Sequence, residues 1–415
     1  MPLFTTSLRQ SKRPEWKQNL LVLWFGTFMA GIGSSCVAPF IALFIDQLGS
    51  FSNSENAFWS GLAFSAPFLT KAVISPFWGH LSDRYGRKPM LIRASLGMAL
   101  VMAATALVGN VYELIGLRLL LGVFNGFVST ANALIAIQVP RNQSGQSLGT
   151  LATGNVSGTL IGPLVGGTIA DFVGYRYTFF MTGICLFISF LLVVFFVHEH
   201  FTPVIQRKDQ PSANFFKVLP NRRIILGMFL TTMIIQASNN SIEPILSLYV
   251  RQLMNGAGHV ALAAGVIEAI NGIATLFAAP FFGRLGDRWG THWILLSGLI
   301  FSMLVFIPMA FVQNIWELGA LRLLIGVSDA ALIPSVQTIL AKNSPHKMMG
   351  EVFSWNQSFQ AVGNVVGPQI GSSVTEFAGY RGVFLSTSLL VLINFLAVFK
   401  NTKSLHQRSK KMNFY

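Results

Sequence analysis

The stretch PFWGHLSDRYG at residues 76–86 is repeated as PFFGRLGDRWG at residues 280–290, an offset of 204 residues. The same offset aligns residues 110–122 with a block of the second half that shares their Asn, Glu, Leu, Arg and Gly. A further block, Gly162-Pro163, recurs 205 residues later as a second Gly-Pro pair. Three blocks in nearly one register indicate that the chain consists of two homologous halves.

The composition indicates that most of each half lies in lipid. The chain has 415 residues, of which 52% are apolar and only 11% are charged, and its mean hydropathy is +0.57. Soluble domains carry about a quarter charged residues. Continuous apolar runs of roughly 20 residues can cross a bilayer as helices, and they predict twelve spans, near residues 20–45, 58–79, 90–108, 114–138, 148–170, 177–197, 223–250, 260–282, 293–312, 318–341, 351–374 and 382–399.

The distribution of Lys and Arg predicts how the spans are oriented. The net charge is +14, and the basic residues lie in short loops on the side of the N-terminus, which is the pattern of cytoplasmic loops. We therefore expect both termini in the cytoplasm of a multi-pass cell-membrane protein. Loops of this kind are topology signals and do not form the single basic face of a nucleic-acid-binding protein.

The repeat and the spans together predict the domain organisation. Each copy holds six spans, an even number, so both enter the membrane in the same sense and are related by a pseudo-two-fold axis along its normal. We expect an all-α membrane protein of twelve transmembrane helices in two six-helix bundles. The expected units are bundles at residues 1–197 and 223–400, a cytoplasmic linker at 198–222, and a tail at 401–415.

The repeated block at residues 79–88 resembles the signature loop between helices 2 and 3 of the major facilitator superfamily. The resemblance implies a cytoplasmic gate latch, in which glycines permit a tight turn and the charged residues bind neighbouring helix ends. The residues that carry it are Gly79, Asp83, Arg84, Gly86, Arg87 and Lys88, with Asp287 and Arg288 in the second copy, where Thr291 and His292 replace the basic pair. The alternative is that the basic residues only anchor the topology.

A glycine string in the fifth span resembles the motif of drug/proton antiporters within this superfamily. It consists of Gly154, Gly158, Gly162, Pro163, Gly166 and Gly167. Glycines four apart clear one helix face for close packing, so ordinary helix packing is the alternative to an antiporter motif. Arg118 and Gly122 resemble the motif of the fourth span. Residues 132–141 and 352–359 are similar to bacterial multidrug efflux proteins of the fluoroquinolone-resistance type.

Charged residues within spans are functional candidates because inserting each one costs about 2.5–3.5 kcal/mol. They are Lys71, Arg118, Glu243, Glu268, Arg322 and Asp329, so all the acids among them lie in the second half. We expect Asp329, which lies deepest, to carry the coupled proton, followed by Glu243 and Glu268. The alternative for Asp329 is a permanent buried ion pair. Arg118 and Arg322 could instead pair with Glu113 and Glu317 or extend to the membrane surface.

The remaining candidates concern the substrate cavity, for which the sequence suggests Lys71, Asn132, Gln236 and Asn240. No nucleotide-binding motif, metal-ligand spacing or catalytic nucleophile with its base is recognisable, so we expect no cofactor, no metal and no enzyme activity. The resemblance implies a monomeric, proton-driven exporter of hydrophobic or amphipathic drugs. The alternative is a facilitator for a sugar or other small metabolite.

Overall fold

The computed structural model of this chain describes residues 15–140, 143–201, 221–344 and 349–402. The first bundle is made of helices at Glu15–Ser35 (α1), Ile41–Leu48 (α2), Asn53–Tyr85 (α3), Arg87–Thr105 (α4), Val111–Phe124 (α5), Phe127–Gln138 (α6), Ser144–Phe172 (α7) and Tyr175–Phe196 (α8). The second bundle is made of Arg222–Leu253 (α10), Val260–Trp289 (α11), Thr291–Met309 (α12), Ile315–Asn343 (α13) and Met349–Asn401 (α14).

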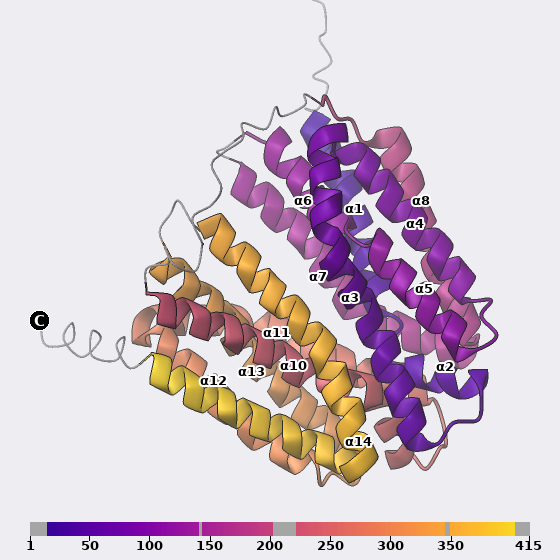
Figure 1. The fold of residues 1–415 in the computed structure, drawn as a ribbon, viewed down its shortest axis with the longest axis vertical. Coiled ribbons are helices and arrows are strands. Elements are labelled where there is room, and N and C mark those ends of the chain that lie inside the picture. Colours follow the sequence, from indigo (N-terminus) through magenta and orange to yellow (C-terminus); the bar gives the residue numbers. More distant parts are fainter. Residues whose placement is uncertain (1–14, 141–142, 202–220, 345–348, 403–415) are drawn as a thin grey trace, which may run out of the picture.

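These helices account for the twelve expected spans. α1 with α2 and α5 with α6 each make one span, whereas α14 contains two spans separated at Gly379, whose φ of 63° is not helical. By length and apolar composition alone, seven of the described helices could cross a membrane. Figure 1 shows the two bundles side by side, with every described element helical, so the predicted fold class is confirmed.

The first span differs from the prediction because it is not one continuous helix. Residues 36–40 form turns between α1 and α2. Pro39 lies in this break, and its nitrogen carries no hydrogen to donate to a helical carbonyl. The chain re-enters the helix where the N–H of Ile41 donates to the carbonyl of Val37, at 3.0 Å.

The fourth span is also broken, at Asn125-Gly126. Gly126 has a φ of 141°, which L side chains rarely adopt. The carbonyl of Val123 accepts hydrogen bonds from Trp78 Nε1 at 2.9 Å and from Arg93 Nη1 at 3.3 Å. Arg93 also stacks over the Trp78 ring, with its guanidinium 3.7 Å from the ring centroid. These two side chains therefore stabilise the interruption by satisfying a carbonyl that the helix leaves open.

The repeated Asn and Glu of the second sequence block cap helices in both bundles. Asn110 accepts a hydrogen bond from the N–H of Glu113 at the start of α5, and Asn314 accepts one from Glu317 at the start of α13, both at 2.9 Å. Each glutamate in turn binds a backbone N–H before its helix. Capping of this kind fixes where a helix begins, which explains why these residues recur.

The glycine string packs α7 directly on the backbone of α1. A side chain at Gly158 or Gly166 would overlap the carbonyl of Phe28 or Cys36. The second bundle repeats this packing between α14 and α10, although it retains fewer glycines: Gly363, Gly367 and Gly371 face the carbonyls of Met233, Ala237 and Ser241. Helix packing within each bundle therefore accounts for most of the string.

The bundles meet at one end, here called the far side because it is opposite the ends of α8 and α10 that flank the linker. Polar contacts between the bundles, among the residues that the structure describes, are Asp46 with Arg251, Asp171 with the N–H of Leu262 at 2.7 Å, and Ser65 with Gln369 at 2.9 Å. All of them lie in the far half of their helices. Figure 1 shows α3 and α14 converging there and spreading apart toward the linker side.

Backbone also meets backbone across this interface. A side chain at Gly167 of α7 would overlap the carbonyl of Ala261, and one at Gly265 of α11 would overlap the carbonyl of Pro163. Pro163 and Gly167 of the string thus contact the opposite bundle, while Gly158 and Gly166 contact their own. The motif therefore has one face for each bundle.

Candidate functional site: buried carboxylates in the second bundle

The three acids predicted for proton coupling come together from three helices of the second bundle. Glu243 lies on α10, Glu268 on α11 and Asp329 on α13. Glu243 directly precedes Pro244, which continues α10 without an N–H of its own, so the helix leaves a carbonyl open one turn earlier. Ile242 and Ile245 on either side are fully buried. The fold thus places the carboxylates in an apolar interior.

Arg322 lies beside this group, and its side chain is only 2% exposed. Its Nη2 is 3.9 Å from Oε1 of Glu243, whose side chain is 11% exposed. The sequence left open a pairing of Arg322 with Glu317 or an extended side chain, and both alternatives are wrong. Glu317 caps α13, and Arg322 is buried near Glu243.

The carboxyl groups of Glu243 and Glu268 lie close enough to interact electrostatically. Oε2 of each is buried and has no donor among the described residues. A carboxylate only accepts hydrogen bonds, so two carboxyl groups can be bonded to each other only when one of them carries a proton. The fold therefore brings two buried carboxyl groups together between α10 and α11.

Asp329 lies in the same cluster, is 5% exposed and has an amide partner. Asn239 Nδ2 of α10 donates to its Oδ1 at 3.0 Å, and Asn271 of α11 lies close by. Buried polar groups cost free energy unless they are hydrogen-bonded. Asp329 thus has an amide donor for its carboxylate, whereas Oε2 of Glu243 and Oε2 of Glu268 have no donor among the described residues.

Arg118 of the first bundle has no comparable partner. Its side chain is 7% exposed, and its Nε and Nη2 have no hydrogen-bond acceptor among the described residues. Its guanidinium carbon lies 5.8 Å from the centroid of the Phe179 ring. Glu113 caps α5 instead of pairing with it, so the expected pairing and the extension to the surface are both wrong here as well.

The gate loop is a sharp turn between α3 and α4. Gly86 has a φ of 96°, as does Gly290 in the second copy, so both turns need glycine. Gly79 does not share this role, contrary to the prediction: it lies within α3, and a side chain there would meet no atom within 4 Å. Arg84 and Arg288 are exposed.

A carboxylate that the sequence did not single out holds this loop. Glu199, beyond the end of α8, accepts hydrogen bonds from the N–H groups of Arg87 and Lys88, at 2.9 and 2.6 Å. Lys88 Nζ also donates to the carbonyl of Val194, at 3.0 Å. An acid at a helix N-terminus binds the free N–H groups there. The side chains of Asp83 and Asp287 lie outside the described residues.

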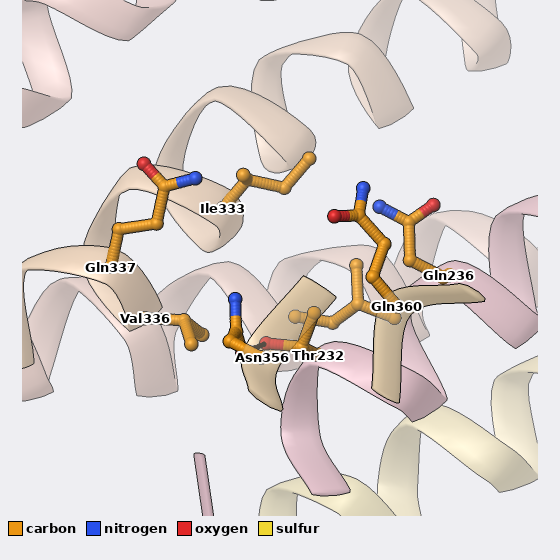
Figure 2. A pocket seen from close by; sticks show the side chains of 8 residues that line it. Thr232, Gln236, Ile333, Val336, Gln337, Asn356 and Gln360 are labelled. Carbon is orange, nitrogen blue, oxygen red and sulfur yellow. Dashed lines mark hydrogen bonds between the residues drawn. The ribbon is translucent and has the colours of Figure 1, made fainter. Parts of the chain in front are cut away.

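One cavity candidate of the second bundle, Gln236, lines a crevice between α10, α13 and α14 on the linker side, whereas the other, Asn240, does not. Figure 2 shows the amides of Gln236, Gln337 and Gln360 directed into the same space. Thr232 donates to Asn356 at 2.8 Å beside them. Asn240, one turn from Gln236, donates to Asn364 at 2.9 Å, so it packs α10 against α14.

The candidates of the first bundle lie apart from this crevice. Asn132 is half-buried on α6, and Lys71 is half-buried on α3. Both cysteines, Cys36 and Cys185, are free thiols. No group of three metal-ligating side chains occurs within residues 15–140, 143–201, 221–344 and 349–402.

Comparison with known families explains this arrangement. The profile of the Major Facilitator Superfamily matches residues 23–268 and again residues 228–413. The chain belongs to the Major Facilitator Superfamily. It is therefore a membrane transporter and not an enzyme.

Curated relatives of this facilitator are called multidrug resistance protein MdtG. The protein of Enterobacter lignolyticus is 48% identical over 379 residues, which are 91% of each chain. The protein of Dickeya zeae is 48% identical over 397 residues, covering 96% of this chain and 97% of its own. The protein of Klebsiella pneumoniae is 49% identical and covers 91% and 92%.

Solved structures share the facilitator fold at low sequence identity. A bacterial homologue of the human lysosomal transporter Spinster, in an inward-facing and occupied conformation, has a TM-score of 0.80 at 14% identity. The match covers 95% of this chain and 98% of that one. The nucleoside transporter NupG has a TM-score of 0.77 at 12% identity, covering 94% and 100%.

Proposed function

We propose that this facilitator exports hydrophobic or amphipathic drugs in exchange for protons. The observation that carries the proposal is the Glu243–Glu268 pair, two facing carboxyl groups on adjacent helices in an apolar interior. The name multidrug resistance protein, borne by relatives 48% identical over most of their length, supports the choice of drugs as substrates. The order of the candidate acids changes accordingly, with the glutamate pair ahead of Asp329.

Charge balance gives the pair its role in the cycle. With all three acids ionised, the cluster holds three negative charges against the single positive charge of Arg322, at 3.9 Å from Glu243. Loading one proton removes one unbalanced charge from a region of low dielectric, where unpaired charges are costly. A state in which α10, α11 and α13 are packed together is thus favoured by the proton, and its release favours their separation or rearrangement.

The bundles provide the second half of an alternating-access cycle. They are joined on the far side and spread apart on the linker side (Figure 1). We assign the linker side to the cytoplasm from the Lys and Arg distribution, so that drug enters the amide-lined crevice from the cell interior. One elementary charge moving across 100 mV supplies about 2.3 kcal/mol, enough for a concentration ratio of some tens.

The test uses purified full-length protein in proteoliposomes. With an imposed pH gradient, norfloxacin should accumulate in the compartment of lower pH, and abolishing the gradient with a protonophore should abolish accumulation. Drug added without a gradient should move protons in the opposite direction, which a lumenal pH dye reports. If drug moves equally well with and without the gradient and no proton movement accompanies it, proton exchange is refuted.

A metabolite carrier is the second candidate, and the crevice of amides is the observation that favours it. Gln236, Gln337 and Gln360 can bind hydroxyl groups as readily as the polar groups of a drug (Figure 2). The same proteoliposomes separate the two candidates. Competition of norfloxacin transport by millimolar glucose, lactose or uridine would favour the metabolite carrier, whereas competition by hydrophobic cations and not by these compounds would favour the drug exporter.

The orientation has its own test. Single cysteines replacing Asn53, at the far-side start of α3, and His200, an exposed residue beyond α8, should react with membrane-impermeant maleimide from opposite faces of intact cells. Labelling of the His200 position from outside would reverse the assignment of the linker side to the cytoplasm.

A further inference from the structure

Lys71 lies near the middle of α3 (Asn53–Tyr85), in the membrane-embedded part of the first bundle. Its side chain is half-buried. Among the described residues, no carboxylate and no hydrogen-bond acceptor is paired with its ammonium. An unpaired charge at this depth costs about 2.5–3.5 kcal/mol on insertion scales, so its retention calls for a role.

The position of Lys71 on its helix turns it away from the most exposed apolar residues of α3. Residues two apart on an α-helix point to nearly opposite sides. Leu69 and Val73, on either side of Lys71, are 48% and 71% exposed and form the outer apolar surface of α3. Lys71 therefore points away from that surface, between the contact of α3 with α5 through Thr70 and its contact with α14 through Ser65.

Its depth places it just beyond the closed end of the molecule. The bond between Ser65 and Gln369 belongs to the far-side contacts that join the bundles. Lys71 lies about one and a half turns further along α3 toward the linker side, at 3.6 residues per turn, and α3 and α14 diverge in that direction (Figure 1). A charged group approaching from the linker side would meet its ammonium at the end of the opening.

The second bundle shows that the fold does not need a lysine here. The equivalent residue of α11 is Thr275, whose hydroxyl donates to the carbonyl of Gly326 at 2.9 Å and so joins α11 to α13. In the first bundle Thr70 performs that task, donating to the carbonyl of Leu119 at 2.8 Å. Because Thr70 makes the contact between α3 and α5, that contact does not require the charge of Lys71.

We propose that Lys71 binds an acidic group of the transported drug, a carboxylate or comparable anion. The predicted spans of the first bundle contain the cations Lys71, Arg93 and Arg118 and no acid, so no carboxylate of these spans competes with a drug anion. Arg118 is buried against Phe179, and Arg93 is bound to the carbonyl of Val123 and stacked on Trp78. Lys71 is the cation of the three for which the described residues give no such contact. This inference rests on the proposed function, since it specifies which drugs the exporter selects.

The test compares two compounds that differ only in the acid: norfloxacin, which has a carboxylate, and its methyl ester. Equilibrium binding to the purified full-length protein is measured by intrinsic tryptophan fluorescence, without any gradient. Lys71→Gln should weaken norfloxacin binding about tenfold or more, the size of a lost charge-assisted bond, while ester binding stays within about twofold. Lys71→Arg, which keeps the charge, should retain most of the affinity for norfloxacin.

Matched controls separate charge from helix damage. Ser75→Ala removes the hydrogen bond from the Ser75 hydroxyl to the carbonyl of Lys71 and leaves the ammonium in place, so it should change neither affinity. Equal weakening of both compounds by Lys71→Gln, or of neither, would overturn the proposal. So would a result in which gluconate replacement of chloride reproduces the Lys71→Gln effect in the wild-type protein, because Lys71 would then bind an inorganic anion.

The two proposals fail in different ways. If the wild-type protein binds both compounds but a pH gradient moves neither, proton-coupled export is wrong, while the Lys71 measurement remains valid as a statement on binding. If the gradient drives both compounds and the Lys71→Gln variant still prefers norfloxacin as the wild type does, export stands and the role of Lys71 is refuted.

Discussion

Arg118 and Arg322 occupy equivalent positions in the two bundles, yet their surroundings differ. Arg322 lies 3.9 Å from Glu243, within a cluster of three acids. Arg118 faces a phenylalanine ring and has no acid beside it. The helix caps and glycine contacts, in contrast, are nearly the same in both bundles. The repeat has therefore kept the framework of each bundle and let the ionisable groups diverge, so that the candidate acids within the spans, Glu243, Glu268 and Asp329, all lie in the second bundle.

The largest effect should come from removing these arginines. Arg322→Met leaves three buried acids without their cation and should lower the free energy of unfolding by about 3–5 kcal/mol. Arg118→Met removes a desolvated charge that has no acceptor and should leave stability unchanged or raised. Thermal unfolding in one detergent compares the two variants directly. A fall of equal size in both would show that Arg118 has a partner of its own.

The next effect concerns the proton. Glu268→Gln keeps a hydrogen-bonding group next to Glu243 but cannot exchange a proton, so transport driven by a pH gradient should fall by about 100-fold or more. Drug binding should persist, and drug-induced proton release should disappear. Asp329→Asn, at a carboxyl that already has an amide donor, should have the smaller effect on proton release. A larger effect of Asp329→Asn would make Asp329 the first candidate for the proton-carrying acid, as its central position in the predicted span suggested.

The framework should respond equally in both bundles. Gly166→Ala and Gly371→Ala each place a side chain against a backbone carbonyl, of Cys36 and Ser241, and each should cost about 1–3 kcal/mol of stability. Gly79→Ala serves as the control, because nothing lies within 4 Å of a side chain there. Clearly unequal costs at the two equivalent positions would break the symmetry inferred for the framework.

The smallest effect should come from the gate loop of the first bundle. Glu199→Ala removes the acceptor for the N–H groups of Arg87 and Lys88 and should cost about 1 kcal/mol. Faster amide hydrogen exchange in the first turn of α4 would accompany it. Glu15→Ala, at an exposed pair with His200 on the same surface, should change neither quantity. Unaltered exchange in the Glu199 variant would show that the loop is held by other contacts.

The spans, their number and the repeat could be predicted because apolar length and Lys/Arg placement are properties of single segments. The two breaks were not predicted, although the sequence contains signals for both: Pro39 in the first and the Asn125-Gly126 pair in the second, a dipeptide typical of turns. An apolar run long enough to span the membrane concealed them. The second break marks a difference between the bundles. The helix is interrupted at Asn125, whereas its counterpart α13 continues without a break through Asp329, the equivalent position.

The sequence identified individual residues of the site but not which of them contact each other. The acids could be identified because charged residues are rare in spans. Their spacing in the sequence does not show that Glu243 lies near Glu268 or that Asn239 donates a hydrogen bond to Asp329. Those pairings depend on how three helices are rotated against each other. Glu199 was missed for a similar reason, since it reaches the gate loop from over 100 residues away along the chain.

Two backbone contacts join the bundles on the far side: Gly167 lies against the carbonyl of Ala261, and Gly265 against that of Pro163. They lower the cost of re-forming this interface in each transport cycle. Backbone touches backbone there, so no side chain has to find its rotamer again when the far side closes. Ordering a side chain at an interface costs about 0.5–1.5 kcal/mol, and this joint avoids that cost at each closure. In the proposed cycle, the two backbone surfaces can therefore separate and re-form without any side chain being reordered.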